Sequence, residues 1–125
     1  MTLRYFSDKE LQCKCCNKLP DSYRTWAVRL DTLRDLYGKP ITISSGYRCP
    51  DYNSSISSTG DNGPHTKCAV DIPCSGSNFH KLLEIGLFMG YKGIGIKQNG
   101  PHSKRFIHFD DVDRKVDHIV IWSYP

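Results

Sequence analysis

The sequence predicts an α+β fold in which a small antiparallel sheet lies beside two main helices. A chain of 125 residues is a common size for one domain. Two segments repeat apolar residues at helical spacing, and five short runs of β-branched and aromatic residues are typical of strands. The chain shows no internal repeat and no linker, so we expect residues 1–125 to form a single domain.

The first helix is expected to follow an irregular segment, residues 1–20, that ends at Pro20. Asp21 or Ser22 can cap this helix, because either side chain can accept hydrogen bonds from the free amides of the first turn. Gly38 and Pro40 predict its end. Its apolar face is formed by Trp26, Leu30, Leu33 and Tyr37.

The second helix is expected to begin at a cap formed by Asn78. Strands are predicted at 41–44, 69–72, 90–96, 106–111 and 117–124. Between them, residues 46–64 are rich in Gly, Ser, Asn, Asp and Pro, which indicates loops or short helical turns. Gly95 would allow another segment to approach its strand closely. The apolar face of the second helix comprises Phe79, Leu82, Leu83 and Gly86.

Charge and hydropathy exclude some classes of protein. The formal net charge is +4, and the basic residues are scattered, so we expect no nucleic-acid partner. A mild positive charge suits an anionic cell surface, and it equally suits ordinary solubility. We expect no membrane span and no secretory signal, because no sufficiently long apolar run occurs. The expected site of synthesis is therefore the cytoplasm, and the expected state is a monomer.

Three residues have the chemical types and spacing of metal ligands: His65, Asp71 and His108. Imidazole nitrogens and a carboxylate oxygen commonly bind a catalytic Zn²⁺, and three protein ligands leave one tetrahedral position open. Strand alternation places Phe106, His108 and Asp110 on one face, where a neighbouring strand can bring Asp71. The alternative is that two structural histidines and a turn aspartate merely lie near one another.

Three segments together resemble the D-Ala-D-Ala carboxypeptidases of peptidase family M15, which have the hedgehog/DD-peptidase fold. These segments are ITISSGYRCPDYN (41–53), GPHTKCAVDI (63–72) and GIGI (93–96) followed by FIHFDD (106–111). The opening FSDKELQCKC and the closing IWSY are similar to smaller members, many of them phage endolysins. The resemblance implies a zinc peptidase that hydrolyses peptidoglycan stem peptides and acts at the cell wall or in the periplasm after release. It leaves open a phage or a bacterial origin, and endopeptidase or carboxypeptidase activity.

The resemblance also implies roles for particular residues. Arg48 corresponds to an arginine that holds substrate near the metal, and a planar guanidinium can bind a carboxylate through two hydrogen bonds. We therefore expect Arg48 at the catalytic site and Asn53 in the same substrate-binding loop, where its role can also be structural. The alternative for Arg48 is a surface ion pair with Asp51.

The general base of larger relatives does not carry over. Its positions hold Arg105 and Phe106, and the interval from His65 to Asp71 is one residue shorter than usual. Asp110 is the remaining carboxylate that can face the site. It can accept a proton from water or orient a ligand histidine. His102, in a glycine-containing loop, is the other candidate. His80 and His118 are expected to be structural.

Two further functions remain open. A metal-binding module without catalysis fits the missing glutamate. An iron oxygenase fits the HFD motif, but it needs a distal histidine, and only His118 follows. The cysteines permit several pairings, and the first three lack the C-x-x-C spacing of a zinc ribbon. We therefore expect no second metal there, and we leave disulfides open. The cysteines are Cys13, Cys15, Cys16, Cys49, Cys68 and Cys74.

Overall fold

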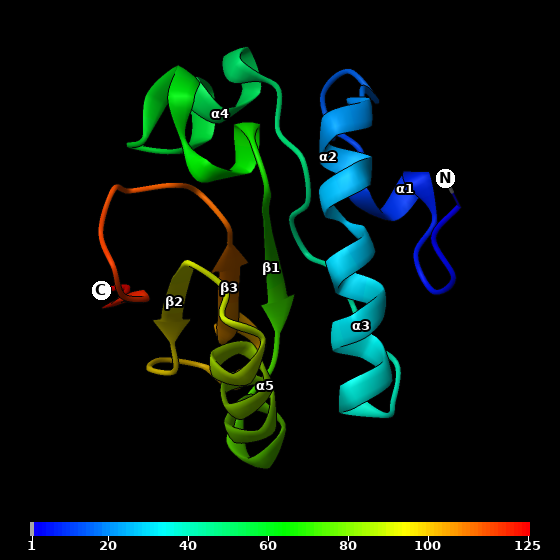
Figure 1. Ribbon diagram of the computed structural model, residues 1–125. Coiled ribbons are helices and arrows are strands. Elements are labelled where there is room, and N and C mark those ends of the chain that lie inside the picture. The colour runs from blue at the N-terminus through cyan, green and yellow to red at the C-terminus, as the bar shows by residue number, and fades with distance from the viewer. Residues whose placement is uncertain (1) are drawn as a thin grey trace.

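The computed structural model describes residues 2–125 as helices around a four-stranded sheet (Figure 1). The strands are β1 (Ala69–Pro73), β2 (Gly93–Lys97), β3 (Phe106–Asp110) and β4 (Val120–Ser123), in the order β1-β3-β2-β4. This confirms the α+β class. The sheet is mixed, however, because β4 pairs parallel to β2 while β3 is antiparallel to β1 and β2. Both edges of β3 are already paired, so β4 joins the free edge of β2 and runs in the same direction.

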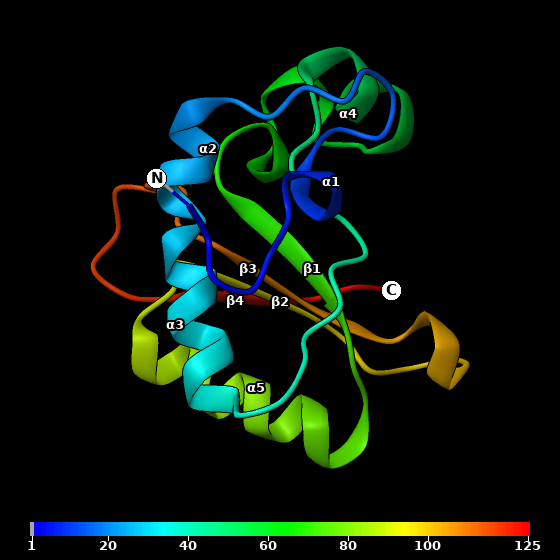
Figure 2. The same cartoon turned by 90° about the vertical axis from the view of Figure 1, so that its right-hand side faces the viewer.

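The helices are α1 (Asp8–Leu11), α2 (Asp21–Trp26), α3 (Val28–Tyr37), α4 (Pro50–Ile56) and α5 (Gly76–Met89). Three 3₁₀ turns complete the fold: η1 (Gly60–Asn62), η2 (Pro64–Thr66) and η3 (His102–Lys104). Helix α5 packs against α3 and β3. Figures 1 and 2 place α4 at one end of the sheet and α5 toward the other. Across residues 2–125, no helix combines the length and apolarity that crossing a bilayer requires.

The structure corrects two helix starts. The first helix begins at Asp21 after Pro20, without a side-chain cap, and divides at Ala27 into α2 and α3. It ends at Gly38 as predicted, with φ of 79°. Asn78 lies within α5 rather than at its cap, because this helix already begins at Gly76. The segment before α2 also contains α1, where Ser7 and Glu10 form a reciprocal capping box.

The strand predicted at 41–44 is wrong. This segment makes only an isolated antiparallel bridge between Ser45 and Asp71. The Ser44 amide donates to the Asp71 carbonyl at 3.0 Å and the Asp71 amide donates to the Ser45 carbonyl at 2.8 Å, but two residues further on the Tyr47 amide donates to the Leu11 carbonyl. The chain therefore turns away from β1 toward the N-terminal segment. Gly46 permits this turn, since a Cβ there would lie 2.6 Å from the Leu11 carbonyl oxygen.

The two faces of the sheet differ in chemistry, as strand alternation predicts. On the face toward the helices, Ile107 and Phe109 are fully buried. Phe109 stacks on Tyr91 with a centroid separation of 4.7 Å and lies directly over Gly86 of α5. The opposite face carries His108. The helical layer thus buries one side of β3 and leaves its other side for polar side chains.

Candidate metal centre

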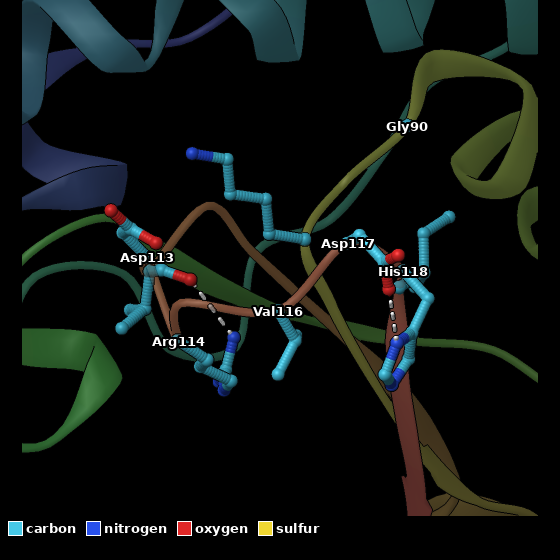
Figure 3. A pocket seen from close by; sticks show the side chains of 9 residues that line it. Gly90, Asp113, Arg114, Val116, Asp117 and His118 are labelled. Atoms are coloured by element: carbon cyan, nitrogen blue, oxygen red, sulfur yellow. Dashed lines mark hydrogen bonds and ion pairs between the residues drawn. The ribbon is translucent and has the colours of Figure 1, made fainter.

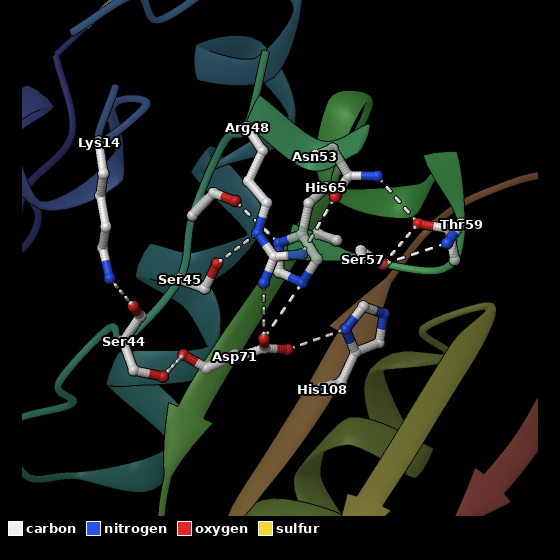
Figure 4. A network of polar contacts seen from close by, with 12 residues as sticks. Lys14, Ser44, Ser45, Arg48, Asn53, Ser57, Thr59, His65, Asp71 and His108 are labelled. Carbon is white, nitrogen blue, oxygen red and sulfur yellow. Dashed lines mark hydrogen bonds and ion pairs between the residues drawn. The ribbon is translucent and has the colours of Figure 1, made fainter. Parts of the chain in front are cut away.

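His65, Asp71 and His108 converge on the polar face of the sheet (Figure 4). Asp71 of β1 lies directly opposite His108 of β3 in the strand register, and His65 comes from η2. The Nδ1 atom of His108 is 2.9 Å from Asp71 Oδ1, and the Nε2 atom of His65 is 3.2 Å from Asp71 Oδ2. The sequence prediction that a neighbouring strand brings Asp71 to His108 is confirmed.

The outer nitrogen of each imidazole has a separate partner. His65 Nδ1 donates to the Gly46 carbonyl at 2.8 Å, and His108 Nε2 donates to Asp110 Oδ2 at 2.7 Å. With the outer nitrogens held in this way, the inner nitrogens His65 Nε2 and His108 Nδ1 both face the Asp71 carboxylate, and a metal ion bound there would replace their contacts with it. Partners of this kind set the tautomer and orientation of metal-binding histidines. The donor set therefore fits a Zn²⁺ ion, which His65 Nε2, His108 Nδ1 and an Asp71 oxygen would hold.

The charges at this site also suit a cation. Burial raises the pKa of Asp71, but hydrogen bonds with His108 and His65 outweigh that effect and hold the pKa well below its ordinary value. Burial lowers the pKa of His108, but hydrogen bonds to Asp110 and Asp71 raise it by more, so the pKa lies above its ordinary value. The His108 ring thus lies between two carboxylates. An anion buried in this way requires a positive partner.

Asp110 lies behind His108 and is fully buried. Arg114 donates to both of its oxygens, at 2.7 and 2.9 Å, and the Val112 amide donates at 3.1 Å. Burial raises the pKa of Asp110, but hydrogen bonds with Arg114 and His108 outweigh it, and the pKa is lowered overall. Gly93 makes room for this arrangement, because a Cβ there would lie 2.4 Å from the Asp110 carboxylate. These contacts are those of a group that orients the His108 ring.

Arg48 lies beside the three converging residues rather than in a surface pair with Asp51. Its Nη2 atom is 3.6 Å from Asp71 Oδ2, and its Nε atom donates to Ser45 Oγ at 3.0 Å. Its Nη1 atom donates to Asn53 Oδ1 at 3.1 Å. Asn53 is almost fully buried, and its amide nitrogen donates to Thr59 Oγ1 at 2.9 Å. The contacts of Asn53 are therefore internal, and they hold the Arg48 guanidinium in place.

A cavity of about 530 Å³ opens above these residues. One side carries an aromatic wall, which we define as Phe106, Trp122 and Tyr124. The Trp122 ring lies 5.2 Å from the His108 ring, and the Tyr124 ring lies 5.1 Å from the Phe106 ring. Burial raises the pKa of Tyr124 to about 12. The other lining residues are Arg48, Ile56, Ser57, Ser58, Thr59, Pro64, His65, Asp71, His108 and Arg114.

The sequence analysis did not assign Trp122, Tyr124 or Arg114 to the site. Gly95 gave an indirect signal, because it was expected to allow close approach. In the structure a Cβ at Gly95 would lie 2.7 Å from Tyr124 and 2.8 Å from Trp122, so both rings pass over this glycine. Arg114 follows Asp110 by four residues in a loop, a spacing that carries no signal outside a helix.

The other histidines lie apart from the three converging residues. His102 of η3 is exposed and does not line the cavity. His80 and His118 are exposed and pair with Glu84 and Asp117. Among the described residues that line the cavity, Asp71 is the only carboxylate. The HFD motif of an iron site is also unsupported, since Asp110 pairs with Arg114 and His118 lies on the surface.

A second cavity of about 370 Å³ lies beneath residues 112–119 (Figure 3). Two of its acidic side chains pair within that loop: Asp113 contacts Lys115, and Asp117 contacts His118. Arg114 lines both cavities, but its guanidinium pairs with Asp110. The three converging residues His65, Asp71 and His108 line only the larger cavity.

The fold and the site define a small α+β protein with two histidines and one aspartate at the base of a cavity. Comparison with family profiles matches Peptidase M15 over residues 4–110. The chain therefore belongs to the M15 peptidases, as the sequence motifs predict. A search of curated proteins found no significant match.

The convergence of His65, Asp71 and His108 predicts that they bind one metal ion together. A His65→Ala, His108→Ala double variant should contain one zinc ion fewer per chain than the wild type, because two of three ligands are gone. Elemental analysis of protein purified without added metal measures this difference. His80→Ala, His118→Ala is the matched control, since it removes two exposed histidines. Equal zinc content in the wild type and the first variant would contradict the assignment.

Proposed function

We propose that this protein is a zinc-dependent peptidase that hydrolyses peptide bonds in the stem peptides of bacterial peptidoglycan. The observation that carries the proposal is the convergence of His65, Asp71 and His108 at the base of a cavity beside Arg48. Membership of the M15 peptidases supports the class of reaction. The sequence motifs shared with cell-wall carboxypeptidases and phage endolysins support the substrate.

The proposed catalytic cofactor is one Zn²⁺ ion held by His65, Asp71 and His108. When bound, zinc polarises a scissile carbonyl and lowers the pKa of water. The protein contributes orientation: the Gly46 carbonyl and the Asp110 carboxylate hold the outer nitrogens of the two imidazoles. Because these partners are the backbone and a buried ion pair, the donor geometry is preorganised.

Arg48 is the proposed anchor for a carboxylate or a carbonyl of the substrate. Its guanidinium is mostly buried, with 16% of the side chain exposed, and contacts with Ser45 and Asn53 keep it from rotating away. The aromatic wall across the cavity offers an apolar surface to the rest of the peptide. Like any tyrosine, Tyr124 is protonated near neutral pH, and burial raises its pKa further, to about 12, so its phenol can donate a hydrogen bond to a substrate.

We assign Asp110 to the orientation of His108 rather than to proton transfer from water. Its oxygens already accept from His108, Arg114 and Val112, and it is not among the residues that line the cavity. His102 is the remaining candidate for a general base, and it would have to be brought in from an exposed turn. The enzyme would be made in the cytoplasm, act on the wall after release, and work as a monomer.

A second function is a module that binds wall peptide without cleaving it. The absence of any carboxylate other than Asp71 among the described lining residues favours this alternative. Both functions use the same cavity, the same arginine and the same metal. They differ only in whether a bound peptide is cut.

Hydrolysis of purified peptidoglycan separates these two functions. The wild type should release new amino or carboxyl termini from the sacculus, and mass spectrometry of the fragments identifies the bond. The His65→Ala, His108→Ala variant and chelated wild type should both be inactive, because the metal is lost. Tight binding to sacculi with no new termini, measured on zinc-loaded protein, would favour the binding module and contradict the peptidase.

Arg48→Lys keeps the positive charge but loses the planar fork. We expect kcat/KM on a stem peptide to fall by about 30-fold, which corresponds to about 2 kcal/mol of transition-state stabilisation. Zinc content should be unchanged. The matched control is Arg24→Lys, since Arg24 pairs with Asp8 and Asp21 and does not line the cavity. Wild-type kinetics in Arg48→Lys would remove Arg48 from the site.

Asp110→Asn should weaken zinc affinity by about 10–100-fold, as expected for a lost partner of a ligand histidine. Activity should therefore fall at limiting zinc and recover at saturating zinc. Asp113→Asn is the matched control, because Asp113 is an exposed aspartate paired with Lys115. A rate defect of about 10²–10⁴-fold that persists with zinc fully bound would instead identify Asp110 as a general base.

A further inference from the structure

Four of the six cysteines meet at one place outside the cavity. Cys13, Cys15 and Cys16 lie in the loop after α1, and Cys49 directly precedes α4. Their sulfur atoms all lie within 4.8 Å of one another. Figure 2 shows this blue loop beside α4. The sequence analysis expected no second metal because the first three cysteines lack C-x-x-C spacing, but the fold brings in Cys49 as a fourth ligand.

The sulfur–sulfur distances match a shared metal ion. The Cys13–Cys15 distance is 3.6 Å, and the Cys15–Cys49 distance is 3.4 Å. A disulfide bond is about 2.05 Å long. A tetrahedral zinc with Zn–S bonds of about 2.3 Å places its sulfurs about 3.8 Å apart. A disulfide also joins sulfurs only in pairs, whereas a central cation explains why all four are mutual neighbours.

Backbone hydrogen bonds hold the cysteines in this arrangement. Cys13 is fully buried, and its sulfur accepts from the Cys49 amide at 3.3 Å. The Cys49 sulfur accepts from the Tyr52 amide at 3.4 Å. The loop closes on itself, because the Cys13 amide donates to the Lys18 carbonyl and Asn17 adopts a left-handed φ of 61°. Amide donors directed at cysteine sulfurs are the usual support for metal-bound thiolates.

We propose that Cys13, Cys15, Cys16 and Cys49 bind one Zn²⁺ ion as a structural site. Four thiolates complete the tetrahedron, so no coordination position is left for water or substrate. This site is separate from the His65, Asp71 and His108 centre, and it does not depend on the proposed peptidase activity. The remaining cysteines, Cys68 and Cys74, are free and lie outside the cluster.

The position of Cys49 indicates what this metal stabilises. Cys49 follows Arg48, whose guanidinium reaches Asp71. Gly46, two residues before Arg48, packs against Leu11, and the Gly46 carbonyl accepts a hydrogen bond from His65. A metal joining the loop after α1 to Cys49 therefore secures the N-terminal segment against the chain that orients both Arg48 and His65.

The test uses the full chain carrying His65→Ala and His108→Ala, so that only the cysteine site remains. Protein purified under reducing conditions should retain about one zinc ion per chain. Replacement by Co²⁺ should give the intense thiolate-to-cobalt charge-transfer absorption of a tetrathiolate centre. Adding Cys15→Ser and Cys49→Ser should abolish both signals, whereas the matched control Cys68→Ser and Cys74→Ser should keep them. Chelation should lower the melting temperature of the His65→Ala, His108→Ala variant.

Two results would overturn the proposal. One is a His65→Ala, His108→Ala variant that has no zinc and gives no thiolate–cobalt absorption. The other is resistance of these four cysteines to alkylation until a disulfide reductant is added. If the Cys15→Ser, Cys49→Ser variant fails to fold, the cobalt spectrum of the chain with all its cysteines still decides, since that absorption arises only from metal–thiolate bonds.

Discussion

The mostly buried carboxylate of Asp71 is the group on which the rest of the site depends. Its side chain faces His65, His108 and Arg48, and its backbone bridges β1 to Ser45. An isolated anion in such a place costs several kcal/mol, so these partners, or a cation that they help to bind, must accompany it. One residue thus joins the sheet, the η2 turn and the arginine-bearing loop.

The two imidazoles are held by different means. The partner of His108 is the buried Asp110–Arg114 ion pair, which substitution can remove. The partner of His65 is the Gly46 carbonyl, which no side-chain change deletes. The position of that carbonyl depends instead on the chain around Gly46 and on its contact with Leu11. His65 is therefore sensitive to the N-terminal segment, whereas His108 is sensitive to the loop after β3.

Local sequence patterns predicted much of the fold and part of the candidate site. Alternation in residues 106–110 correctly separated His108 from the buried Ile107 and Phe109. The α+β class and the M15 family are confirmed, whereas zinc and the substrate stay predictions. The errors have a common cause in long-range contacts. Residues 41–44 have strand-forming side chains, but the chain leaves β1 because Tyr47 bonds to Leu11.

Other features had no local signal at all. Cys49 lies 34 residues after Cys15 in the sequence, and only the folded chain brings their sulfur atoms together. The burial of Asn53 and the parallel pairing of β4 with β2 likewise depend on neighbours far away in sequence. Spacing rules for zinc ribbons describe ligands on one knuckle. They say nothing about three ligands from one loop and a fourth from the start of a helix.

Gly93 and Gly95 have a consequence for how the cavity can change. Side chains at these positions would collide with the Asp110–Arg114 pair and with Trp122 and Tyr124. The central strand β2 therefore contributes no side chain to the polar face at these two positions and cannot be varied there to reshape it. The shape of the cavity can instead vary at the end of α4 and in the turn after it, where Ile56, Ser57 and Ser58 line the cavity.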